Sequence, residues 1–78
     1  MSTNEMDVAS YSEFAEESIR KFIEMGNYEG AHVQLCSYLL EMQDRFVSNE
    51  INRKTWRESV RLYRRLTMAV MEESNIQQ

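Results

Sequence analysis

The stretch NRKTWRESVRLYRR, residues 52–65, predicts one amphipathic helix. Asn52 is a favourable N-cap residue, so we expect the helix to begin directly after it. Apolar residues recur every three or four positions through this stretch and just beyond it, as on one side of a helix. They are Trp56, Val60, Leu62, Tyr63, Leu66, Ala69 and Val70. The opposite side carries Arg53, Arg57, Arg61 and Arg64, with Lys54 and Arg65 beside them. We call these six bases the cationic face.

Residues 28–48 predict a second helix with two apolar stripes. The first stripe is Ala31, Leu35, Tyr38, Leu39, Met42 and Phe46, and the second is Val33, Cys36, Leu40 and Val47. Together the stripes cover roughly 220° of the helical wheel, which is more than one neighbouring helix would bury. We therefore expect this helix either to lie in the middle of the bundle or to place one face in a subunit interface.

Residues 10–25 predict the first helix. Ser10 and Glu13 have the spacing of a capping box, and Gly26 and Asn27 tolerate the backbone conformation that ends helices. Its apolar side is Tyr11, Phe14, Ala15, Ile19, Phe22, Ile23 and Met25. Residues 1–9 show no periodicity, so we expect a loose tail there and fraying at residues 75–78. The predicted fold is all-α, with one domain over residues 10–74 and a short first helix on a longer antiparallel helical hairpin.

Composition narrows the class of protein. The 78 residues include 42% hydrophobic residues, two glycines and no proline, which suits a small core of long helices. Cys36 is the one cysteine, so no internal disulfide forms and a reducing compartment fits best. The N-terminal residues lack the pattern of a signal peptide, and no apolar run reaches the ~18 residues of a membrane span. We expect a cytoplasmic protein without a membrane segment, in the host cytoplasm if a phage encodes it.

Charge is distributed unevenly along the chain, although the net charge is only −4. Residues 1–50 hold ten acids and three bases, a net charge of −7, whereas residues 51–71 hold six bases and one acid, a net charge of +5. Such an asymmetry indicates an interaction surface. An acidic remainder would repel a polyanion, so we expect nucleic acid to be an unlikely partner.

Catalytic and metal chemistry have little support in the sequence. His32 and Cys36 are four residues apart and could meet on one helix, but a nucleophile also needs an orienting group and an oxyanion hole. Two ligands would leave a zinc site incomplete. We expect no enzyme activity, no cofactor and no metal, with Cys36 as a small apolar residue of the core and His32 at the surface.

Several interpretations of the cationic face remain open. It could be a solvated helix face, or it could bind an acidic partner, including the acids of the first helix in another protomer: Glu13, Glu16, Glu17 and Glu24. Guanidinium groups also bind phosphate, so a small anionic ligand such as a nucleotide is a further interpretation.

Two segments resemble known families. FIEMGNYEGAHVQLCSYL, residues 22–39, resembles the turn of a tetratricopeptide-type helical hairpin, which implies hairpin packing. YSEFAEESI, GNYEGAHV and LTMAV resemble the phage anti-CBASS sponges, small helical hairpins that sequester cyclic-nucleotide signals. This second resemblance implies an oligomer with ligand pockets between protomers. It makes Tyr11 and Lys21 candidate ligand contacts, at or near the positions of that family's tyrosine and lysine.

The sequence therefore favours a small, non-enzymatic helical binding protein. We expect it to form a homo-oligomer and to regulate or inhibit a macromolecular partner, which its arginines bind through an acidic surface. The alternative is a sponge that holds a small anionic signal between protomers.

Overall fold

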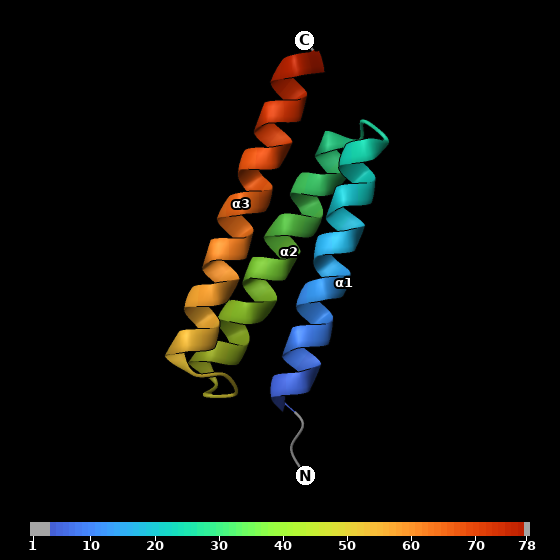
Figure 1. Cartoon of the computed structure of the whole chain (residues 1–78). Helices are drawn as coiled ribbons and strands as arrows, with labels where there is room; N and C mark the ends of the chain where they lie inside the picture. The colour runs from blue at the N-terminus through green and yellow to red at the C-terminus, as the bar shows by residue number, and fades with distance from the viewer. Residues whose placement is uncertain (1–3, 78) are drawn as a thin grey trace.

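Three helices, each antiparallel to the next along the chain, make up the described part of the protein. The structure is a computed structural model that describes the backbone of residues 4–77 and the side chains of residues 8–75. The helices are α1 (Asn4–Glu24), α2 (Tyr28–Val47) and α3 (Arg53–Gln77). Figure 1 shows α2 between the other two, with the start of α1 at the same end as the α2–α3 loop. The C-terminal turns of α3 project beyond the α1–α2 turn. The predicted all-α, three-helix fold is confirmed.

The core lies where the three helices face one another. Its side chains come from every helix, and several are fully buried: Ile19, Leu35, Tyr38, Met42 and Leu66. The first stripe of α2 supplies the centre of this core, as the periodicity predicted. Burying a side chain of this size contributes roughly 1.5–3 kcal/mol.

Local signals set the helix ends. Gly26 has a φ of 75°, which glycine adopts without strain, and it follows the last turn of α1. The side chain of Asn27 then accepts a hydrogen bond of 3.0 Å from the backbone N–H of Gly30 and so caps α2. Asn52 caps α3 in the same way, 2.8 Å from the backbone N–H of Thr55. The predicted ends at Gly26 and Asn52 are confirmed.

The predicted boundaries of the outer segments are wrong. α1 begins at Asn4 rather than Ser10, so the capping box at Ser10 does not form, and α3 continues to Gln77 rather than fraying at residue 75. Val8 is buried and extends the apolar stripe of Ala15 and Ile19 toward the N-terminus, which explains the additional turns of α1. Residues 1–3 and 78, part of the predicted loose ends, lie outside the described residues.

Two parts of the predicted apolar surface do not enter the core. Phe14 of α1 and Met25, one residue past the end of α1, are exposed. Phe14 lies at the edge of the helix side on which Ala15 and Ile19 are buried. On α2, Val33, Leu40 and Val47 are exposed as well, so the second stripe points away from both neighbouring helices. α2 therefore lies in the middle of the bundle and still presents an apolar outer face. Among residues 4–77, no helix is both long and apolar enough to cross a membrane.

Candidate functional site

Four of the six bases of the cationic face lie on the outer side of α3. Arg53, Arg57, Arg61 and Arg64 are all exposed, and Leu62, Leu66 and Val70 are buried on the opposite side of the same helix. At 1.5 Å of rise per residue, the four arginines form a row about 16 Å long. The structure therefore brings these four predicted residues together on one surface.

No carboxylate among the described side chains forms an ion pair with this row. Among the side chains of residues 8–75, the ion pairs are Arg20–Glu16 at 2.9 Å and Arg45–Glu41 at 3.0 Å. The first pair lies within α1 and the second within α2, so neither involves α3. The guanidinium groups of α3 thus keep their donors available for an external carboxylate or phosphate, which each can bind with two parallel hydrogen bonds.

Apolar side chains extend the same surface. Met68 and Met71 follow the arginines on α3, and their exposed fractions are 59% and 56%. Met42, in contrast, is fully buried in the core. A cationic row that ends in flexible, exposed thioethers combines charge recognition with an apolar surface that adapts to different partners.

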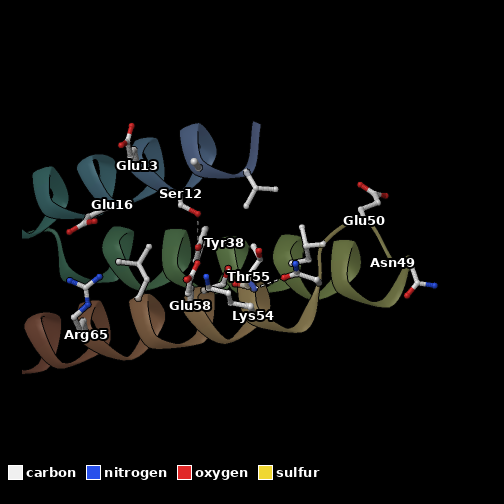
Figure 2. Close-up of a pocket in the computed structure, with 16 residues that line it drawn as sticks. Ser12, Glu13, Glu16, Tyr38, Asn49, Glu50, Lys54, Thr55, Glu58 and Arg65 are labelled. Atoms are coloured by element: carbon white, nitrogen blue, oxygen red, sulfur yellow. Dashed lines mark hydrogen bonds between the residues drawn. The ribbon is translucent and has the colours of Figure 1, made fainter. Parts of the chain in front are cut away.

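Lys54 and Arg65 turn toward a groove between α1 and α3. This groove has a volume of about 870 Å³, and Tyr38 of α2 lies at its floor. Figure 2 shows Glu16 of α1 and Arg65 of α3 pointing toward one another, whereas the carboxylate of Glu13 points away from α3. The residues that line the groove include four acids, Glu13, Glu16, Glu50 and Glu58, and only these two bases. The groove is therefore less favourable to an anion than the outer side of α3.

Tyr11 and Lys21 lie apart from the arginines, on α1. Lys21 is exposed in the last turn, where the helix dipole favours a base. Tyr11 is half-buried and stacks on Tyr38, with ring centroids 5.6 Å apart. The guanidinium of Arg45 lies 5.9 Å from the centroid of the Tyr11 ring. Within one chain, these two candidates do not form a common site with the cationic face.

Burial controls the ionisation of Tyr11. Desolvation raises the pKa of its phenol above 10.0, Glu41 and Tyr38 raise it further, and Arg45 acts in the opposite direction. The neutral phenol is therefore favoured in the folded chain. Tyr11 acts here as a packing residue between α1 and α2.

The comparisons with known proteins give no family. No family model, curated protein or solved structure matches this chain. Function has to be inferred from the geometry alone.

His32 and Cys36 do meet on α2, as their spacing predicted. The Cys36 Sγ lies 3.7 Å from the His32 Nε2. No third side chain from the described residues converges on this pair as a metal ligand would, and no cluster of three His, Cys, Asp or Glu side chains occurs elsewhere in that part of the chain. Among the described residues, the pair therefore lacks the additional ligands of a zinc site.

One feature of the surface was not predicted from the sequence. The groove between α1 and α3 depends on how far apart two non-consecutive helices lie, and periodicity gives no measure of that distance. The one signal in the sequence that indicates this groove is the presence of two polar residues, Ser12 and Ser59, among apolar neighbours on their helices. Ser12 lies 2.8 Å from the Tyr38 hydroxyl, and Ser59 donates to the backbone carbonyl of Thr55 at 3.0 Å.

Proposed function

We propose that this chain is a small, non-enzymatic helical binding protein that docks on an acidic surface of another protein and so regulates or inhibits it. The observation that carries the proposal is the exposed row Arg53, Arg57, Arg61 and Arg64, which has no carboxylate partner among the described side chains. Exposed charges of one sign add little to the stability of a fold, so their grouping has a better explanation in binding.

The spacing of the row favours a helical partner. Arginines four residues apart on one helix are about 6 Å apart, which is the spacing of carboxylates four residues apart on a facing helix. Each such pair forms a charge-assisted hydrogen bond whose geometry a guanidinium satisfies better than an ammonium does.

An acidic protein is a better partner than nucleic acid because of the rest of the chain. The isoelectric point is about 4.9, and residues 1–50 carry a net charge of −7. A long polyanion would extend past the cationic row and meet this acidic surface, whereas a partner with a short acidic patch would contact the row alone. Charge complementarity of this kind accelerates association and selects the partner.

The test uses the full chain and a labelled alanine-based peptide with a glutamate at every fourth position. Fluorescence anisotropy measures its dissociation constant for the wild type and for the double variant Arg57→Glu with Arg61→Glu. We expect the charge reversal to weaken binding by about tenfold or more, the equivalent of ~1.4 kcal/mol.

Matched controls separate this proposal from general charge attraction. Arg20→Glu with Lys21→Glu changes the net charge equally, but on α1, and we expect its affinity to stay within about twofold of the wild type. A matching glutamine peptide should not bind. Equal loss in both double variants, or no binding of the glutamate peptide by the wild type, would contradict the proposal.

Two further ligands test the other interpretations. Tighter binding of duplex DNA than of the glutamate peptide would favour a nucleic-acid partner. A cyclic nucleotide alone should leave the unfolding temperature unchanged, because a ligand that binds only the folded state raises it by mass action. A rise that Lys21→Glu abolishes would favour the sponge instead.

A further inference from the structure

We infer that the outer face of α2 is a self-association surface on which a second copy of this chain packs antiparallel, around a two-fold axis at Leu40. The proposal is separate from the docking role of α3, because the two surfaces lie on different helices. It begins from three exposed side chains on α2: Val33, Leu40 and Val47.

These three residues form one continuous line. They are spaced seven residues apart, so they repeat after two helical turns and share one side of α2. Their exposed fractions are 58%, 62% and 72%, although all three are aliphatic. The buried residues Ala31, Leu35, Tyr38 and Met42 occupy the other side, against α1 and α3. A linear apolar face that no helix of the described residues covers is typical of an interaction site.

The spacing suits a second copy of the same helix. Val33 and Val47 are equidistant from Leu40, so a two-fold axis at Leu40 places each Leu40 on its counterpart and each Val33 against the partner's Val47. A surface that matches itself in this way forms an isologous interface, which closes at a dimer.

The polar residues beside the line also match under this symmetry. Asp44 comes to lie next to the partner's Ser37, whose hydroxyl can donate to the carboxylate. Gln43 comes to lie next to the partner's Cys36. The two Asp44 carboxylates are about 12 Å apart along the helix axes, so like charges do not meet. None of the six bases of α3 belongs to this face.

The molecule offers enough area for such a dimer. Its Cα atoms extend 47 × 18 × 15 Å. A stable dimer buries about 800 Å² on each partner, which corresponds to most of one broad side of the bundle. The interface would therefore reach from α2 onto the adjoining edges of α1 and α3, and a chain of 78 residues gains buried apolar area from it.

The first test is the mass of the full chain in solution. Sedimentation equilibrium over a concentration series should give about twice the chain mass of 9.3 kDa for the wild type. Leu40→Gln should weaken the dimer by about tenfold or more. Met68→Gln is the control. It also replaces an exposed apolar side chain with glutamine, but on the side of α3 opposite to α2, and it should leave the dimer intact. Circular dichroism confirms that both variants remain helical.

A cysteine pair tests the register. Gln43→Cys should form a disulfide with the partner's Cys36 under mild oxidation and yield a covalent dimer. Within one chain these positions are about 10 Å apart along the helix, too far for a disulfide. Gln43→Cys combined with Cys36→Ser removes one half of the pair and should remain monomeric on a non-reducing gel.

Four results would overturn the inference. A wild-type mass of one chain at every concentration excludes self-association. If the Leu40→Gln variant still forms the dimer, the interface lies elsewhere. If Arg57→Glu with Arg61→Glu dissociates the dimer instead, the interface is formed by the acids of α1 and the bases of α3. A covalent dimer that forms equally well without Cys36 would contradict the antiparallel register.

Discussion

Phe46 and Trp56 stack with nearly parallel rings, whose centroids are 5.4 Å apart and whose planes are 6° from parallel. The stack joins the last turn of α2 to the first turn of α3 across the loop between them. Trp56 stands between Arg53 and Arg57 along α3, so this contact fixes the direction in which the cationic face begins.

The stack should contribute measurably to stability. Phe46→Leu keeps an apolar side chain but removes the ring, so we expect the free energy of unfolding to fall by about 1 kcal/mol. Urea denaturation followed by Trp56 fluorescence measures this change. Phe14→Leu makes the same substitution at an exposed position of α1 and should change stability by less than about 0.5 kcal/mol. Equal losses from both variants would show that the stack has no particular role.

The hydroxyl pair of Ser12 and Tyr38 should join α1 to α2. The two oxygens lie 2.8 Å apart, and Tyr38 is only 1% exposed. Tyr38→Phe should lower the free energy of unfolding by about 1 kcal/mol, because a partly buried hydrogen bond is lost. A double-mutant cycle with Ser12→Ala measures the coupling between the two groups. Strictly additive losses would mean that the hydrogen bond itself does not stabilise the fold.

Alkaline pH should destabilise the chain through Tyr11. Its pKa is raised in the folded state, chiefly by burial, so the unfolded chain loses this proton first as the pH rises. The associated stability is complete below pH 10.0 and is lost as the pH rises through the folded-state pKa. A spectroscopic tyrosine titration should show a late-titrating phenol that Tyr11→Phe removes, together with part of the alkaline loss of stability. Loss of the earliest phenol instead would contradict the assignment.

The two proposed surfaces should respond differently to salt. Exposed ion pairs are screened when the Debye length shortens from about 10 Å at 0.1 M to about 3 Å at 1 M salt. Binding of the glutamate peptide should therefore weaken steadily over this range, while the dimer formed through Leu40 should persist or strengthen. The same anisotropy and sedimentation measurements give both results. A dimer that dissociates with added salt would indicate an interface of charges rather than of aliphatic side chains.

Much of the fold follows from local rules that the sequence displays. The cap at Asn52, the stop at Gly26 and the buried stripe of α2 each depend on a few neighbouring residues, and all three occur as predicted. The start of α1 was missed because one buried residue, Val8, extends the helix where the surrounding residues are polar. Periodicity places Phe14 on the apolar side, yet it is exposed. Periodicity alone does not show how wide the contact between two helices is.

The candidate site is only partly readable from the sequence. The position of the arginine row on the outer side of α3 could be predicted, because it depends only on the geometry of one helix. The separation of Tyr11 and Lys21 from that row, and the turn of Arg65 toward a groove lined with carboxylates, depend on how three helices pack. Helical periodicity contains no information on that packing.

The most direct test of the docking proposal is a nuclear magnetic resonance titration of the isotope-labelled chain with the glutamate peptide. We expect backbone and arginine side-chain signals to change mainly at Arg53, Arg57, Arg61 and Arg64, and we expect no such changes with the glutamine peptide. Changes centred instead on the groove at Glu16, Tyr38 and Leu62, or an unchanged spectrum, would contradict the claim that the cationic face is the binding surface.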